Sequence, residues 1–181
     1  YLEWKDPYPF TLEELKAAEA SQEVLIAGLF HKKNFLDIMQ NFTVFEPVDG
    51  RVIKKIPRYQ QFRAVHKTIE RIKTGKTQRD KSGVIWHTQG SGKSLTMVFL
   101  AIKMRRDPEL RDYKLVFLTD RTQLDTQLTT TFRNAQGETI RHADSVKSLK
   151  ELLASDASDI VTAMVQKFQE NADDMNFPVL N

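Results

Sequence analysis

The pattern of apolar and polar positions changes near residue 58. In 59–73 the apolar side chains recur at spacings of three and four, which predicts a helix with one buried face. Further along, short apolar runs alternate with helical patterns. This order indicates an α/β fold with a parallel sheet, flanking helices and right-handed crossovers. The elements predicted there are strands at 83–87, 114–119, 139–141 and 159–163, and helices at 94–106, 121–132, 144–154 and 166–169.

Upstream of residue 58 the pattern is mainly helical. Thr11 and Glu14 form a capping-box sequence, which predicts the start of a short helix. Asn34 is expected to start a later helix. We therefore divide the chain into a helical linker or accessory region, 1–57, and an α/β region, 58–181. The elements predicted upstream are helices at 12–20, 22–30 and 35–42, a strand at 43–45 and a turn at 49–50.

The composition narrows the class of protein. Of the 181 residues 40% are apolar and 28% are charged, a mixture typical of a globular soluble protein. The absence of cysteine excludes disulfides, thiolate zinc sites and cysteine nucleophiles and fits a reducing compartment, so we expect a cytoplasmic protein. No apolar run approaches the roughly 18 residues of a membrane span, so we expect no membrane partner. The chain begins with Tyr1 rather than Met, which favours a fragment or a processed piece.

The charges are unevenly distributed along the chain. Residues 1–50 carry 4 basic and 9 acidic groups, residues 51–81 carry 11 basic and 2 acidic groups, and residues 82–181 carry 12 basic and 13 acidic groups. The net charges of these segments are −5, +9 and −1. The basic block has two interpretations, which are attraction to phosphate or a solvated helix face followed by a basic loop.

The segment HTQGSGKS, residues 87–94, lies between a predicted strand and a predicted helix, the context that a phosphate-binding P-loop requires. Gly90 and Gly92 let the backbone fold closely around phosphate oxygens. The N–H groups of 89–94 and the start of the following helix attract the same anion. The Lys93 ammonium can reach the β- and γ-phosphates, and the Ser94 hydroxyl can ligate Mg²⁺. We therefore expect ATP and Mg²⁺ as cofactors.

This loop departs from the strict Walker A sequence at its first position, where His87 replaces glycine. The departure is typical of the helicase-type variant of the motif. We interpret His87 as structural rather than catalytic, and we expect Trp86 in the core rather than as a platform for adenine. Thr88 and Gln89 are either nucleotide contacts or ordinary loop residues.

Four segments together resemble a known family. RYQQFRAV at 58–65, GVIWHTQGSGKSLTM at 83–97, FLTDRTQLD at 117–125 and DIVTAMVQKF at 159–168 are similar, in the same order, to segments of the motor (R) subunit of type I restriction–modification enzymes. The resemblance implies a RecA-like lobe of a superfamily 2, ATP-dependent translocase of double-stranded DNA. It also implies a nuclease domain elsewhere in the protein, and modification and specificity subunits as partners.

The resemblance assigns further site residues. Gln60 would read the adenine, with Tyr59 or Arg58 packed nearby; an amide can pair a donor and an acceptor with the edge of that base. DNA-backbone contacts are implied for Thr119, Arg121 and Gln123 and for Thr162, Gln166 and Lys167. The full set of predicted ATP-binding residues is Tyr59, Gln60, Thr88, Gln89, Gly90, Ser91, Gly92, Lys93 and Ser94, with Lys93 as the catalytic residue and Ser94 as the Mg²⁺ ligand.

A motor of this kind also needs an Asp-Glu segment at the end of a strand, one carboxylate for Mg²⁺ and the other for the attacking water. No Asp-Glu pair follows residue 94, and the acidic pair at 173–174 does not follow an apolar strand. Neither a nuclease core nor the second motor lobe with its arginine finger is found in the sequence. We therefore expect the first part of the first RecA-like lobe, which binds ATP without hydrolysing it, from a parent type I site-specific deoxyribonuclease.

Three alternatives stay open at this point. One is the lobe of another superfamily 2 helicase or translocase, of the type III restriction or repair kind. Another is a small-molecule kinase or nucleotide-binding regulator, which predicts a lid with clustered arginines and its own acidic Mg²⁺ ligand. The last is a non-catalytic DNA-binding module that uses the basic block 51–81, which predicts salt-sensitive binding independent of ATP.

Overall fold

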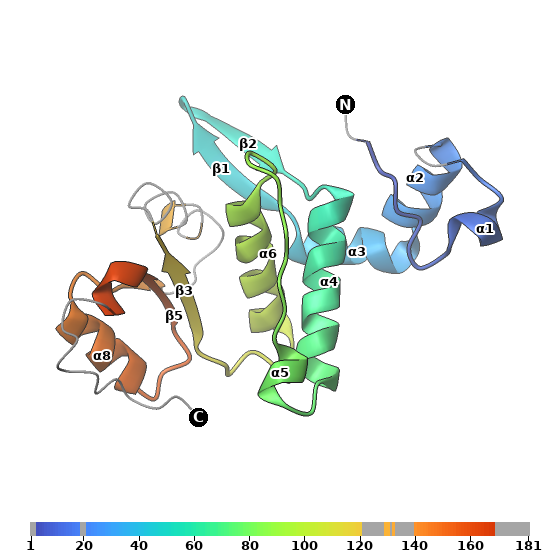
Figure 1. Ribbon diagram of the computed structural model, residues 1–181. Helices are drawn as coiled ribbons and strands as arrows, with labels where there is room; N and C mark the ends of the chain where they lie inside the picture. The colour runs from blue at the N-terminus through green and yellow to red at the C-terminus, as the bar shows by residue number, and fades with distance from the viewer. Residues whose placement is uncertain (1–2, 19–20, 121–128, 131, 133–139, 169–181) are drawn as a thin grey trace. The chain divides into compact units, whose positions relative to one another are not determined.

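The computed structural model describes residues 3–18, 21–120, 129–130, 132 and 140–168 (Figure 1). The chain forms two compact units, Tyr1–Lys103 and Met104–Asn181. The predicted boundary between residues 57 and 58 rests on the change of sequence pattern there and differs from this division; it stays a prediction. Within the described residues no helix is both long and apolar enough to cross a membrane.

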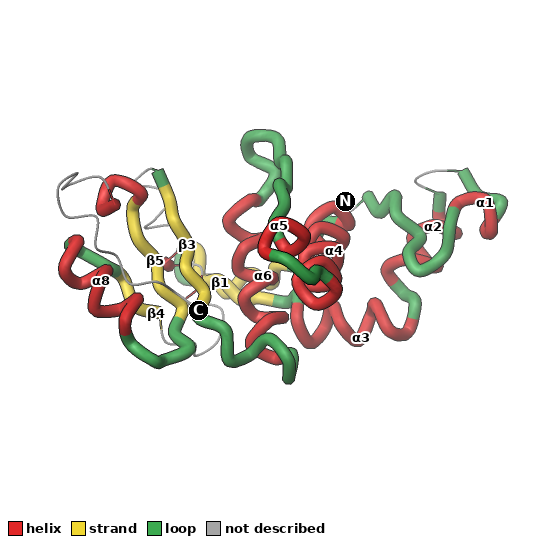
Figure 2. The backbone as a smooth tube through the Cα atoms, turned by 60° about the horizontal axis from the view of Figure 1, so that its bottom comes forward, coloured by secondary structure: helices red, strands yellow, loops and turns green. Residues whose placement is uncertain are grey.

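The first unit is mainly helical (Figure 2). Its last helix, α6, starts beside the P-loop and extends three residues past the boundary between the units. The elements are α1 (Leu12–Leu15), α2 (Gln22–Leu29), α3 (Lys32–Asn41), β1 (Val44–Val48), β2 (Arg51–Lys55), α4 (Tyr59–Thr74), α5 (Gln78–Lys81) and α6 (Lys93–Arg106).

The N-terminal region contains a β-hairpin as well as the predicted helices. Strands β1 and β2 pair antiparallel, with Val44 opposite Lys55. The predicted turn at 49–50 is confirmed, because Asp49 and Gly50 both have positive φ angles, the signature of a two-residue hairpin turn. Strand β2 was not predicted, since its sequence RVIKK is mostly charged and its strand conformation comes from pairing with β1. The description of 1–57 as helical was therefore incomplete.

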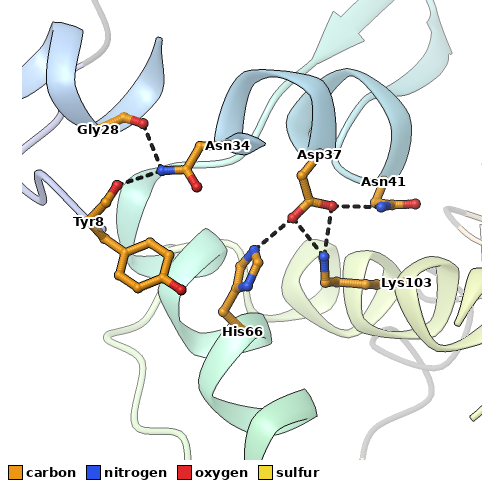
Figure 3. A network of polar contacts seen from close by, with 7 residues as sticks. All are labelled: Tyr8, Gly28, Asn34, Asp37, Asn41, His66 and Lys103. Atoms are coloured by element: carbon orange, nitrogen blue, oxygen red, sulfur yellow. Dashed lines mark hydrogen bonds and ion pairs between the residues drawn. The ribbon is translucent and has the colours of Figure 1, made fainter. Parts of the chain in front are cut away.

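Two helices in this region have limits that differ from the prediction. Helix α1 has the predicted capping box, but it ends after one turn because Lys16 adopts a left-handed conformation, with φ 49°. Helix α3 begins before Asn34, which is a buried helical residue rather than the helix start. Its side-chain amide donates hydrogen bonds to the carbonyl oxygens of Tyr8, at 2.5 Å, and Gly28, at 2.8 Å (Figure 3). Asn34 thus ties α3 to α2 and to the N-terminal segment.

An aromatic cluster forms the core between α3, α4 and α6. Phe42, Phe62 and Phe99 are fully buried, and the ring of Phe42 lies 5.0 Å from that of Phe62 and 5.4 Å from that of Phe99. Trp4 joins this cluster through Phe62, at 5.8 Å. The predicted apolar face of α4 is thereby confirmed, since Phe62, Val65 and Ile69 are all buried.

Asp37 is the centre of a polar cluster that joins the same three helices (Figure 3). Its carboxylate, on α3, accepts hydrogen bonds from His66 Nε2 at 2.7 Å and from Lys103 Nζ at 2.6 Å, on α4 and α6. Asn41 Nδ2 donates a third, at 2.6 Å. Burial raises the pKa of Asp37, but the hydrogen bonds from His66, Asn41 and Lys103 outweigh it and hold the pKa at about 2. The carboxylate is therefore ionised at neutral pH.

The second unit contains a parallel sheet, as predicted. Its three strands have the order β3-β5-β4, and β5 pairs in parallel with both neighbours. Leu149 and Leu153 of the neighbouring helix pack on the sheet side chains Val161 and Ala163. Ser145, not the expected Asp144, caps that helix, because its hydroxyl accepts from the Ser148 N–H. The elements are β3 (Leu115–Thr119), β4 (Ile140–His142), α8 (Val146–Ala154), β5 (Ile160–Met164) and the 3-10 helix η1 (Val165–Phe168).

The strand predicted at 83–87 is wrong for the structure described here. The segment forms no ladder with any strand of the described residues. Val84 is 93% exposed and Trp86 is 81% exposed, so the expectation that Trp86 lies in the core is also wrong. An apolar run indicates that a segment favours a sheet, but the strand exists only when a neighbouring strand supplies the hydrogen-bond partners.

We predict that Asp37→Asn lowers the free energy of unfolding at pH 7 by about 2 kcal/mol, the energy that corresponds to a pKa held at about 2 instead of 3.8. Because the pKa is lowered by folding, this stabilisation is present above the unfolded pKa and is lost as the pH falls through about 2. Denaturant titrations of both proteins between pH 7 and pH 2 should therefore converge at low pH.

The matched control is Asp49→Asn, which changes an exposed carboxylate in the hairpin turn where asparagine also tolerates a positive φ. Its stability should stay within about 0.5 kcal/mol of the unmodified protein. A difference between Asp37→Asn and the unmodified protein that does not change with pH would contradict the assignment.

Candidate functional site

The P-loop has the backbone geometry that its glycines predict. The Ser91 N–H donates to the Thr88 carbonyl oxygen at 3.3 Å, which closes a four-residue turn. Gly90, the third residue of this turn, has a φ of 75°, as a type II turn requires. Gly92 follows with a φ of 87°, and a side chain there would also collide with the Gln61 amide. Both positions therefore need glycine.

The loop leads directly into the N-terminus of α6, which begins at Lys93. The Gly92 carbonyl accepts the Thr96 N–H at 3.0 Å, so the helical ladder starts immediately after the loop. The first N–H groups of a helix have no partner within the helix, and the helix dipole makes this end positive. Such a loop and helix start together attract an anion.

The Lys93 ammonium lies across the loop. Nζ donates to the carbonyl oxygens of His87, at 3.4 Å, and Thr88, at 3.2 Å, while the side chain stays exposed. These are weak contacts with neutral acceptors, and charged phosphate oxygens are stronger partners for an ammonium group. Lys93 is thus placed where a bound phosphate would take over its hydrogen bonds.

The Ser94 hydroxyl fits a role as a magnesium ligand. It lies in the first turn of α6, is partly buried, and makes no hydrogen bond with the described residues. The described residues contain no cluster of three His, Asp or Glu side chains that could hold a metal by themselves. Mg²⁺ is commonly held by one or two protein oxygens together with phosphates and water, a donor set that a serine and a nucleotide can supply.

Sequence reasoning missed Gln61. Its side chain is buried, its Nε2 donates to the Gly92 carbonyl at 3.0 Å, and its Oε1 accepts the Arg58 N–H at 2.8 Å. Gln61 therefore ties the start of α4 to the P-loop. A signal was present, because glutamine three residues after a helix cap is the capping-box position.

The other predicted nucleotide contacts differ in accessibility. Gln60, Thr88 and Gln89 have exposed side chains. Tyr59 is half-buried, with its ring edge-on to Trp4 at 6.4 Å. The structure therefore leaves Gln60 available to a ligand, whereas Tyr59 packs on the N-terminal segment.

A basic groove of about 700 Å³ lies between α4 and the segment 81–86. Among its cations, Arg63 pairs with Asp6 at 2.8 Å, whereas Lys67 and Lys81 make no ion pair with the described residues. The lining residues that carry charge, polarity or an aromatic ring are Gln60, Arg63, Lys67, Thr68, Glu70, Arg71, Thr74, Lys81 and Trp86.

In the second unit, Gln166 lies at the carboxyl ends of β3 and β5, as predicted. Its Nε2 donates to the Asp120 carbonyl at 3.0 Å, which brings the ends of the two strands together. Thr119, at the end of β3, is buried. Arg121, Gln123 and the side chain of Lys167 lie outside the described residues.

Thr162 does not face outward. Its side chain is fully buried, and its hydroxyl lies 3.1 Å from His142 Nδ1 and 3.4 Å from Thr129 Oγ1. The resemblance implied a DNA contact at this position, and burial counts against it. Thr162 is the middle one of the five paired residues of β5, inside the parallel sheet, which explains why this threonine points into the unit.

Comparison with known proteins agrees with this geometry. Residues 60–181, about two thirds of the chain, match the SWI2/SNF2 ATPase family. The chain is 36% identical over 181 residues to a Methanocaldococcus jannaschii protein with the provisional name of type I restriction enzyme MjaIXP endonuclease subunit, a match that covers 97% of this chain and 17% of that protein. It is 35% identical over 164 residues to the type I restriction enzyme HindI endonuclease subunit of Haemophilus influenzae, covering 87% of this chain and 16% of that protein.

The chain spans about a sixth of the length of these curated relatives. The resemblance that its four segments suggested is confirmed by matches over nearly the whole chain. The P-loop, the parallel sheet and these matches lead to one conclusion, that the chain belongs to the SWI2/SNF2 ATPase family and is similar to the endonuclease subunits of type I restriction enzymes.

Proposed function

We propose that the chain binds ATP with Mg²⁺ in the P-loop and is the nucleotide-binding part of an ATP-dependent, double-stranded-DNA-translocating motor in a type I restriction endonuclease subunit. The observation that carries the proposal is the P-loop itself, with two glycines at positive φ in front of α6 and the Lys93 ammonium across its mouth. The names of the relatives supply the type of enzyme.

The residues divide into distinct roles in this proposal. The N–H groups of the loop and of the first turn of α6 bind the phosphates, Lys93 neutralises their charge, and Ser94 ligates the Mg²⁺. Gln60 recognises adenine, because its exposed amide lines the groove beside residues 83–86, which lead into the P-loop. Gln61 does not touch the nucleotide and instead fixes the loop through the Gly92 carbonyl.

Hydrolysis needs groups that this sequence does not supply. No Asp-Glu pair follows the P-loop, so the chain has no recognisable carboxylate to orient the attacking water. We therefore propose that the chain binds ATP without turning it over. In the complete enzyme, modification and specificity subunits would be the partners, and Gln166 at the sheet edge would face the DNA backbone.

The basic groove supports a second candidate function, DNA binding that is independent of nucleotide. Lys67 and Lys81 line its walls and make no ion pair with the described residues, and Arg71 adds a third positive charge. Phosphates attract such a cluster whatever the base sequence. This candidate and the motor are distinguished by the effect of Mg·ATP on DNA affinity.

We predict that Lys93→Ala weakens binding of a non-hydrolysable ATP analogue by at least tenfold, measured by calorimetry with Mg²⁺, because hydrogen bonds to charged groups contribute about 1.5–3 kcal/mol. Lys33→Ala, which removes an exposed cation from the start of α3, should bind as the unmodified chain does. Equal affinity of both variants would rule out the phosphate role of Lys93. Turnover of ATP by the chain that disappears in Lys93→Ala would show that it does hydrolyse ATP.

We predict opposite behaviour for the two neighbouring glutamines. Gln60→Ala should reduce the preference for ATP over GTP by about fivefold, the loss of about one hydrogen bond, without changing the thermal midpoint. Gln61→Ala should weaken all nucleotides alike and lower the thermal midpoint by several degrees, because it leaves buried partners unsatisfied. The reverse pattern would exchange the roles of the two residues.

We predict that the double variant Lys67→Glu/Arg71→Glu lowers duplex-DNA affinity equally with and without Mg·ATP if the groove binds DNA. The negative slope of log K against log salt concentration should become shallower by about 2, roughly 0.9 for each phosphate that the variant no longer neutralises. Lys32→Glu/Lys33→Glu, two exposed lysines at the start of α3, is the control because it changes the net charge by the same amount. An unchanged slope would leave the groove without a DNA-binding role.

A further inference from the structure

His87 occupies the position at which the strict P-loop motif has glycine, so a side chain is present where most such loops have none. The imidazole is partly buried and lines a cavity of about 90 Å³. Most of the cavity wall is apolar, and its members besides His87 are Val65, Thr68, Ile85, Lys93, Thr96, Met97 and Leu100. The two ring nitrogens of His87 therefore have few possible hydrogen-bond partners. Each hydrogen bond helps to decide whether the ring proton is on Nδ1 or on Nε2.

The contact with Ser91 determines the tautomer. His87 Nδ1 lies 3.1 Å from Ser91 Oγ, and the same hydroxyl donates its proton to the Thr88 carbonyl at 2.7 Å. A serine hydroxyl has only one proton, so it must accept in its contact with the ring. Nδ1 is therefore the protonated nitrogen, and it donates to Ser91.

The second ring nitrogen faces the first turn of α6. His87 Nε2 lies 3.5 Å from Thr96 Oγ1, a long contact, and Thr96 also reaches the Gly92 carbonyl at 3.2 Å. With Nδ1 protonated, a neutral ring accepts at Nε2. The Thr96 hydroxyl has one proton for two acceptors, the Gly92 carbonyl and Nε2, and both connect the loop to α6. Its contacts are longer than those of Ser91, so the contacts at Ser91 set the tautomer.

The charge environment favours this neutral ring. Burial lowers the pKa of His87, and the positive charge of Lys93 lowers it further. Among the described residues that line the cavity, Lys93 is the only one with a charged side chain. The ammonium is connected to the same residue through the His87 carbonyl, so a second positive charge on the ring would be unfavourable there.

We propose that His87 is a positioning residue for the nucleotide, whose neutral ring, protonated at Nδ1, braces the P-loop between Ser91 and the first turn of α6. The brace holds the turn at 88–91 closed before any phosphate arrives. This proposal rests on the proposed function, because its effect is measured as nucleotide affinity.

Three substitutions at His87 separate the two ring nitrogens. The amide nitrogen of asparagine is the same number of bonds from Cβ as Nδ1, and that of glutamine is the same number as Nε2. His87→Asn therefore keeps the donor to Ser91, His87→Gln keeps only the position of Nε2, and His87→Ala removes both. Nucleotide affinity is measured with a non-hydrolysable ATP analogue and Mg²⁺, and the thermal midpoint without nucleotide is measured in parallel.

We expect His87→Ala and His87→Gln to bind the analogue about fivefold more weakly, and His87→Asn to bind within twofold of the unmodified chain. The pair His87→Ala and Ser91→Ala should be non-additive, because both remove the same hydrogen bond. Equal affinity for all three His87 variants would overturn the positioning role. So would losses of affinity that simply parallel the decreases in thermal midpoint, because they would reflect stability alone.

The tautomer has its own readout. In ¹⁵N spectra of the chain at neutral pH, Nδ1 of His87 should have the shift of a protonated nitrogen and Nε2 that of an unprotonated one. Protonation at Nε2 would overturn the proposal. If Lys93→Ala leaves the affinity unchanged, the proposed function fails; if only the His87 variants leave it unchanged, this inference fails and the proposed function stands.

Discussion

The hydrogen bond from the buried Gln61 amide to the Gly92 carbonyl is the contact on which the arrangement of the first unit depends. It fixes the P-loop to α4 at the point where α6 begins. A second connection lies further along the helices, where Asp37 accepts from His66 of α4 and Lys103 of α6. The aromatic rings of Phe62 and Phe99 are buried in the core between these helices. Two helices joined at two levels form a rigid support for a loop that must present its N–H groups in one direction.

Much of this arrangement follows from local patterns in the sequence. The spacing of apolar residues predicted α4 to within one residue, because a buried helix face imposes a period close to 3.6. Gly90 and Gly92 predicted the shape of the loop, since few other residues adopt positive φ at low cost. The parallel sheet of the second unit was likewise predicted from alternating strands and helices.

The features that were missed depend on partners distant in sequence. Asn34 looked like a helix start, because asparagine favours that position, yet its amide is used to join Tyr8 and Gly28. Gln61 was passed over in favour of Gln60. Its capping-box position is a local signal for the bond with Arg58, but nothing local shows that its amide also donates to a carbonyl thirty residues away. The segment at 84–86 is apolar enough for a strand, but pairing is a property of its neighbours.

The exposure of Trp86 has a practical consequence. The chain has two tryptophans, and they stand in opposite surroundings, Trp4 only 3% exposed in the aromatic core and Trp86 81% exposed just before the P-loop. Their emission spectra should therefore be separable, with the red-shifted, quencher-accessible component belonging to Trp86. The protein thus has a native optical probe at the entrance to its phosphate loop and a second one that reports on the integrity of its core, without any label.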